Sequence, residues 1–179
     1  DELRKLARSK GGRLFMSAAT AAALPTLDVG RLCTAGARIT AVEGILNGTT
    51  NYILTRMGQE GCDYATALQA AQDLGIAETD PTLDVEGRDA AHKMAILTAL
   101  AYGMEINYDD IFIEGISRIT PMDIAFADQF GYRIKLLAIS KFQDNRVEAR
   151  VHPTMIPIKN LLASISGTVN AITLSGDAV

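Results

Sequence analysis

The chain has little cysteine: only Cys33 and Cys62 occur among its 179 residues, and tryptophan is absent. Neither cysteine belongs to a C-x-x-C pair or lies at a metal-ligand spacing from a histidine, which argues against a disulfide framework and against a zinc site. Two isolated thiols are typical of small buried side chains in a reducing cytosol. We therefore expect a cytoplasmic protein.

The chain also lacks a surplus of basic residues and any long hydrophobic run. Lysine and arginine number 17 against 21 aspartates and glutamates, which gives a net charge of −4. A nucleic-acid-binding domain normally carries a basic stripe, and a transmembrane helix needs about 20 consecutive apolar residues. The sequence has neither feature, so we expect no nucleic-acid partner and no membrane association.

A dinucleotide-binding fingerprint is missing as well, because no G-x-G-x-x-G follows a predicted strand. The chain begins with Asp1-Glu2-Leu3 rather than with methionine. Its length suits one domain that buries roughly two thirds of the surface of the unfolded chain. We expect residues 1–179 to form a single domain cut from a longer protein.

The sequence does contain an interleaved series of strand and helix patterns. Apolar residues, alternating or continuous, predict strands at 38–46, 133–142, 147–151 and 169–174. Amphipathic spacing predicts helices at 1–10 (with Leu3 and Leu6 inside), at 63–74, at 120–131, and a long helix ending near 103. Residues 143–145 join two antiparallel strands, and Pro153 and Pro157 are expected to break the second. The pattern indicates an α+β fold, a mixed β-sheet with one face covered by helices.

The most unusual stretch is residues 78–93, which contains five carboxylates, a lysine and a histidine. Asp89 and Lys93 are spaced i,i+4 and therefore share one helix face. That face continues as Ile96, Leu97 and Leu100, which predicts a largely buried helix. Removing an ion pair from water costs several kcal/mol per charge, and pairing returns only part of it. We therefore interpret Asp89 and Lys93 as part of a ligand site rather than as a solvated pair.

Further carboxylates precede that helix. Asp80-Pro81 keeps the chain extended, and Asp84 is a candidate N-cap for the first free amides. With Asp84 in that position, the side chains converging at one helix start would be Glu78, Asp84, Asp89 and Lys93. A proton-transfer site needs such converging ionisable groups, because their surroundings set their pKa values.

A second polar segment, Asn47-Gly48-Thr49-Thr50-Asn51, follows a predicted strand and precedes a predicted helix. Free amides and hydroxyls at such a turn can bind a small anionic group. The same segment can equally be a plain helix start with Thr49 or Thr50 as its cap. The residues alone leave both interpretations open.

Both segments resemble those of the homoserine dehydrogenase family. The likeness is carried by residues 44–54 (GILNGTTNYIL) and 77–97 (AExDPTxDVxGxDAAxKxAIL), with further similarity at Val151-x-Pro153 and Asn170-Ala171. It covers essentially the whole chain. The resemblance implies an NAD(P)-dependent interconversion of L-homoserine and L-aspartate 4-semialdehyde, on the route to threonine, methionine and isoleucine.

The resemblance also implies roles for individual residues. Lys93 would exchange a proton with the substrate oxygen, Asp89 would bind substrate and orient Lys93, and Asp84 would support the lysine beside the substrate. Glu78 would hold the substrate amino group and contact the cofactor. Three more positions complete the implied site: the substrate-pocket residues Gly48 and Thr49, and Gly75 near the nicotinamide.

Other parts of the family pattern are missing from this chain. The family carries its Rossmann domain ahead of the region that begins at Asp1, so NAD or NADP would bind mainly outside residues 1–179. We therefore expect this segment alone to be inactive. The resemblance further implies a homodimer. It also implies a monovalent cation held by the backbone carbonyls of Ser17, Thr20, Ala22 and Leu24. In this segment the family's acidic residue and glycines are replaced by Ser17 and the run Ala21-Ala22-Ala23.

Two other interpretations compete with this one. Asp80, Asp84 and Asp89 could supply oxygen ligands to Mg²⁺ in a hydrolase or lyase, although Lys93 beside them would repel the ion. Alternatively, the chain is a non-catalytic dimerisation or regulatory module whose charged helix start binds a partner.

Overall fold

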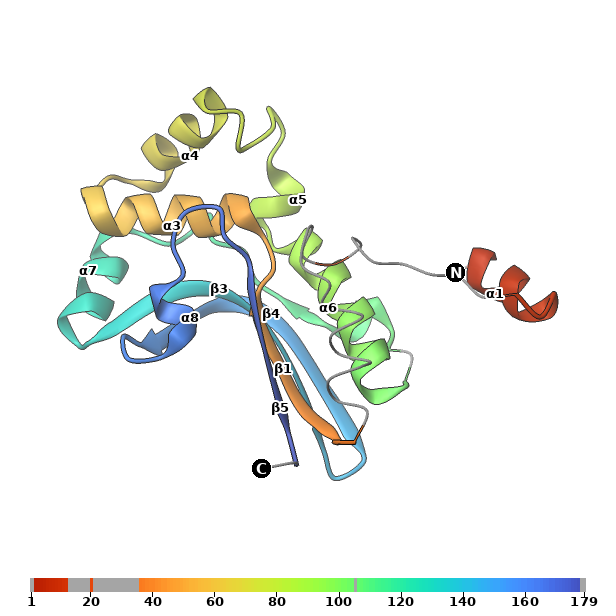
Figure 1. Ribbon diagram of the computed structural model, residues 1–179. Helices are drawn as coiled ribbons and strands as arrows, with labels where there is room; N and C mark the ends of the chain where they lie inside the picture. The colour runs from red at the N-terminus through yellow and green to blue at the C-terminus, as the bar shows by residue number, and fades with distance from the viewer. Residues whose placement is uncertain (1, 13–19, 21–35, 105, 178–179) are drawn as a thin grey trace.

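The computed structural model describes residues 2–12, 20, 36–104 and 106–177. Helices and strands are interleaved along these residues, with four successive α-helices between the first two strands (Figure 1). In chain order they are α1 (Glu2–Ser9), β1 (Ile39–Ile45), α3 (Gly48–Glu60), α4 (Tyr64–Asp73), α5 (Thr82–Val85), α6 (Arg88–Tyr102), η1 (Tyr108–Asp110), β2 (Phe112–Ile113), α7 (Pro121–Gln129), β3 (Tyr132–Gln143), β4 (Arg146–Pro157), α8 (Leu161–Ser164) and β5 (Ala171–Gly176). Within the described ranges, no helix is long and apolar enough to cross a bilayer.

The strands form one five-stranded sheet in the order β2-β4-β3-β1-β5. Strands β3 and β4 are the predicted antiparallel hairpin, paired from Tyr132↔Pro157 to Gln143↔Arg146. Asp144 and Asn145 both have positive φ, 51° and 58°, which is typical of the tight turns that match strand twist. Strand β1 is antiparallel to β3 and β5, whereas β2 is parallel to β4. The sheet is therefore mixed, and the predicted α+β class is confirmed.

Strand β4 continues through Pro153 and ends at Pro157, so the expectation of a break was wrong for Pro153. The Val151 carbonyl accepts the Glu114 N–H at 2.8 Å on the β2 side. Residues two apart face the same edge, so Pro153 and Pro157 also turn their nitrogens to that side. Strand β2 pairs only with Arg150 and Val151. A proline beyond that point loses no hydrogen bond to a described strand.

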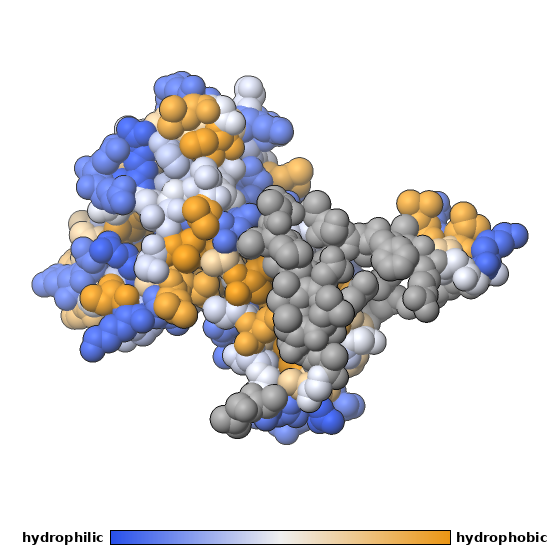
Figure 2. All heavy atoms as spheres, in the orientation of Figure 1, coloured by the Kyte–Doolittle hydropathy of each residue, from blue (hydrophilic) through white to orange (hydrophobic). Residues whose placement is uncertain are grey.

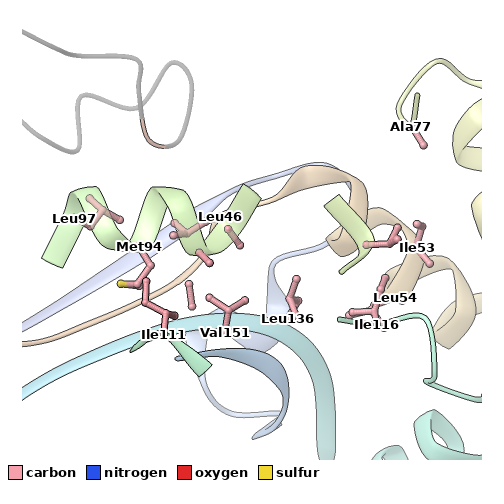
Figure 3. Packing of buried hydrophobic residues seen from close by; sticks show 14 of the residues in the cluster. Leu46, Ile53, Leu54, Ala77, Met94, Leu97, Ile111, Ile116, Leu136 and Val151 are labelled. Carbon is pink, nitrogen blue, oxygen red and sulfur yellow. The ribbon is translucent and has the colours of Figure 1, made fainter. Parts of the chain in front are cut away.

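Helices α3 and α6 cover one face of the sheet. Ile53 of α3, Met94 of α6 and Val151 of β4 are each 0% exposed and belong to one continuous core (Figure 3). Fully burying a side chain of this size contributes roughly 1.5–3 kcal/mol. The same core contains Leu46, one residue beyond β1. This packing holds β1, α3 and α6 against one another.

The other face carries a smaller core under helix α8. Ile45, Leu137 and Ile156 lie there, and α8 contributes Leu162 and Ala163. Two successive β3 residues, Leu136 and Leu137, therefore belong to different cores, as strand geometry requires. The prediction of helices on one face of the sheet is thus correct for the larger core. It did not include the short helix α8 on the other face.

Helix α1 forms where it was predicted, but its apolar side is not buried. Leu3 and Leu6 are 68% and 55% exposed. Figure 1 shows α1 standing apart from the sheet, and Figure 2 shows hydrophobic atoms at its surface. The expectation that both leucines face inward was therefore wrong.

Candidate functional site

The turn between β1 and α3 is organised by Asn47. This residue is the N-cap of α3, with extended backbone angles (φ −133°, ψ 119°). Its side-chain oxygen accepts the Thr50 N–H at 2.9 Å, as N-cap residues do. The alternative that Thr49 or Thr50 is the cap was wrong. The Thr49 hydroxyl instead donates to the Ile76 carbonyl at 3.1 Å.

The amide nitrogen of Asn47 joins two carboxylates of the charged stretch. It donates to Asp84 Oδ1 at 2.7 Å and to Asp89 Oδ2 at 2.9 Å. A side-chain amide has two N–H donors, and both are used here. Asn47 is 5% exposed, so a buried neutral donor holds the two carboxylates side by side. No role of its own was predicted for Asn47, although an asparagine ahead of a predicted helix is a common cap.

Lys93 completes this cluster from the second turn of α6. Its Nζ donates to Asp89 Oδ2 at 2.7 Å and to the Leu46 carbonyl at 2.9 Å. An ammonium has three N–H donors, and the third meets no acceptor among the described residues. The side chains of Lys93 and Asp89 are 23% and 31% exposed. The ammonium is therefore held in one place by a side chain that remains partly exposed.

Asp84 reaches the cluster from a different position than predicted. It lies inside the short helix α5 and does not cap α6. The N-cap of α6 is Gly87, which has φ 78° and makes no side-chain cap hydrogen bond. Glycine suits this position for two reasons. A left-handed backbone is strained for other residues, and a Cβ here would lie 3.3 Å from Val151 Cγ1.

Glu78 does not join the other three predicted residues. Its side chain is exposed and forms no hydrogen bond or ion pair within the described part of the chain. Gly75, with φ 69°, is also exposed. Both belong to the segment between α4 and α5, where the Gln72 side chain donates to the Glu78 carbonyl at 3.1 Å. The Thr49 hydrogen bond to Ile76 ties this segment to the start of α3.

Three of the four positions predicted to hold a cation, Ser17, Ala22 and Leu24, lie outside the described residues, as does Cys33. The fourth, Thr20, is 0% exposed. Over the described ranges, no group of three or more His, Cys, Asp or Glu side chains is arranged to hold a metal ion. Asp84 and Asp89 instead share the neutral amide of Asn47, and Asp89 also accepts from Lys93, so the geometry gives no support to the Mg²⁺ interpretation.

The sequence matches a family of known proteins over most of its length. A family model described as homoserine dehydrogenase matches residues 25–179. The chain is 43% identical over 179 residues to the homoserine dehydrogenase of Pseudomonas aeruginosa, and 45% identical over 182 residues to that of Corynebacterium glutamicum. These matches cover 100% and 99% of this chain but 41% of each relative. The chain thus spans about two fifths of the length of the curated relatives it matches.

Solved structures agree with the sequence match. A homoserine dehydrogenase from Thiobacillus denitrificans superimposes with a TM-score of 0.96 at 43% identity, over 99% of this chain and 41% of that chain. A putative homoserine dehydrogenase from Archaeoglobus fulgidus gives a TM-score of 0.90 at 39% identity, over 98% of this chain and 53% of that chain.

Proposed function

The chain belongs to the homoserine dehydrogenase family, and from that premise we propose that the protein interconverts L-homoserine and L-aspartate 4-semialdehyde with NAD or NADP. The observation that carries the proposal is the Lys93 ammonium, which Asp89 and the Leu46 carbonyl hold while one N–H is left without an acceptor among the described residues. The enzyme would act in the cytoplasm, on the route to threonine, methionine and isoleucine.

Lys93 is the proton-transfer group in this proposal. In the reducing direction its ammonium donates a proton to the carbonyl oxygen of the semialdehyde. In the oxidising direction the neutral amine takes the proton of the homoserine hydroxyl. The nicotinamide cofactor, when bound, supplies or accepts the hydride. Asp89 orients Lys93 by accepting its N–H at 2.7 Å, and Asp84 is joined to the pair through Asn47.

The remaining site residues would bind the substrate and the edge of the cofactor. We propose that Glu78 pairs with the substrate ammonium and that Gly48 and Thr49 border the pocket at the start of α3. Gly75 and Glu78 are both exposed. A nicotinamide nucleotide held on another domain could therefore reach them, which is consistent with a contact to the cofactor. The carboxylate of Glu78 has no partner among the described residues, so it is available to a cationic group.

Residues 1–179 would form the substrate-binding and dimerisation domain of a homodimeric enzyme. A monovalent cation is part of the same proposal, held by backbone carbonyls at Ser17, Thr20, Ala22 and Leu24. The absence of a dinucleotide fingerprint from the chain supports a nucleotide site elsewhere in the protein.

The test is the oxidation of L-homoserine by the full-length protein with either nucleotide. Lys93→Ala should lower kcat about 10²-fold or more, because positioned acid–base groups contribute rate factors of this order. Lys159→Ala is the matched control, since Lys159 is exposed and outside the cluster. Circular dichroism should be unchanged in both variants. A Lys93→Ala enzyme with the full rate would refute the assigned role.

A further inference from the structure

A second lysine, Lys135 on β3, is buried without a counter-charge. It is 5% exposed, and no carboxylate lies within ion-pair distance of its ammonium in the described part of the chain. Its Nζ donates to Asn51 Oδ1 at 2.9 Å and to the Ile165 carbonyl at 2.5 Å. Buried charges are normally paired. A lysine held only by neutral acceptors is therefore unusual, and the other contacts of those acceptors indicate its role.

Asn51 holds the same segment from the other side. It lies in the first turns of α3 and is 1% exposed. Its amide nitrogen donates to the Ile165 carbonyl at 3.4 Å and to the Val169 carbonyl at 3.2 Å. Lys135 and Asn51 therefore fix both ends of the segment 165–169, which joins α8 to β5.

That segment lies directly against the turn that carries the candidate site. A Cβ on Gly48 would be only 2.7 Å from the Thr168 carbonyl oxygen. Contacts this short do not occur with real Cβ atoms, so the backbone of 168 occupies the space beside the start of α3. Gly48 follows Asn47, whose amide holds Asp84 and Asp89. A displaced segment 165–169 would therefore move the turn that sets the position of Asp89 and, through it, of Lys93.

We propose that Lys135 and Asn51 are positioning residues, which clamp the segment 165–169 against Gly48 and thereby hold the Asn47–Asp89–Lys93 arrangement in place for proton transfer. Neither residue touches substrate. The proposal rests on the proposed function, because it assigns Lys135 and Asn51 an effect that acts through Lys93.

The test compares Lys135→Met in two backgrounds of the full-length enzyme. In the wild-type background we expect kcat to fall about tenfold or more, since small misplacements of catalytic groups are costly. In the Lys93→Ala background the same substitution should change the residual kcat by less than about twofold, because groups that act as a unit are non-additive. A merely structural role would lower kcat by the same factor in both backgrounds. Lys141→Met, on an exposed position of the same strand, is the matched control.

A second measurement reports on the chemical step itself. With homoserine deuterated at the carbon that loses hydride, the isotope effect on kcat should rise in Lys135→Met, because misplaced proton transfer slows chemistry relative to product release. Loss of folded enzyme alone leaves the isotope effect unchanged. If Lys135→Met does not fold, Lys135→Gln and Asn51→Ala carry the same comparison.

Equal losses in both backgrounds, or an unchanged kcat in folded Lys135→Met, would overturn the inference. If instead the Lys93→Ala enzyme keeps the full rate, the proposed function itself is wrong. That result differs from both outcomes above, so a failure of the proposed function can be told apart from a failure of the positioning role.

Discussion

At the scale of single residues, Asn47 has two separable tasks. Its oxygen caps α3 through the Thr50 N–H, and its nitrogen donates to Asp84 and Asp89. The first task stabilises a helix start, and the second keeps two carboxylates and one lysine in a fixed arrangement. A substitution that preserves one task and removes the other can therefore tell stability from catalysis.

Asn47→Asp is such a substitution. Aspartate is as good an N-cap as asparagine, but it places a third carboxylate where the amide donated to two others. We expect kcat for homoserine oxidation to fall by tenfold or more, since like charges would push Asp89 away from its present position. Asn47→Ala should lower both kcat and the free energy of unfolding, the latter by about 1 kcal/mol for the lost cap. Steady-state kinetics and urea unfolding check both effects. An Asn47→Asp enzyme with wild-type kcat would contradict the role given to the amide.

Lys135 makes a prediction about pH that is independent of catalysis. Burial, reinforced by the nearby positive charge of Arg133, lowers the pKa of Lys135 from 10.5 to about 8. Between these values the unfolded chain holds the proton and the folded chain has released it. The unfolded state then binds more protons, so this residue makes stability rise with pH in that window.

The difference between wild type and Lys135→Met isolates that contribution. From pH 8 to pH 10 the free energy of unfolding of the wild type should increase relative to the variant, and below pH 8 the difference should be constant. Lys141→Met provides the reference for an exposed lysine of the same strand. Urea unfolding at each pH gives the measurement, and a difference that stays constant from pH 8 to pH 10 would show that the folded state retains the proton.

At the scale of helices and strands, local signals predicted elements wherever the decisive contacts are near in sequence. Asp63 caps α4 through the Thr66 N–H at 2.8 Å. Thr120 and Asp123 form a reciprocal capping box at the start of α7, with Pro121 at the first helical position. The β3–β4 hairpin followed from its apolar pattern and polar turn. Each of these signals is complete within a few residues, so no knowledge of the fold was needed.

The errors arose where a distant element decides the outcome. Pro153 is tolerated in β4 because β2 pairs with only two residues of that strand, Arg150 and Val151. The N-cap of α6 is Gly87 and not the predicted Asp84. A side chain at Gly87 would press against Val151, which is distant in sequence. In the candidate site, the i,i+4 spacing of Asp89 and Lys93 predicted their ion pair. The bond from Lys93 to Leu46, 47 residues away along the chain, could not be read from spacing.

At the scale of the molecule, the described part of the chain contains the cluster that we propose for proton transfer but no recognisable nucleotide site. Asp84, Asp89 and Lys93 meet where β1, α3, α5 and α6 come together. The hydrogen bond from Thr49 to Ile76 ties the segment that carries exposed Gly75 and Glu78 to the start of α3. Hydride transfer requires the nicotinamide to lie beside the substrate carbon. The sequence of residues 1–179 has no G-x-G-x-x-G after a strand, so pyrophosphate binding of the usual kind has no local basis.

The last prediction concerns residues 1–179 produced alone. Their continuous core and five-stranded sheet should give a far-ultraviolet circular dichroism spectrum of mixed helix and strand. We expect no binding of NADH or NADPH in a fluorescence titration and no homoserine oxidation with either nucleotide. The full-length protein, measured at equal concentration, should show both. In the proposed arrangement another part of the protein orients the nucleotide, so free nucleotide should not restore turnover to residues 1–179 even though they contain Lys93 and its partners. Turnover by residues 1–179 alone would show that the segment holds the cofactor itself, and the division of labour proposed here would be wrong.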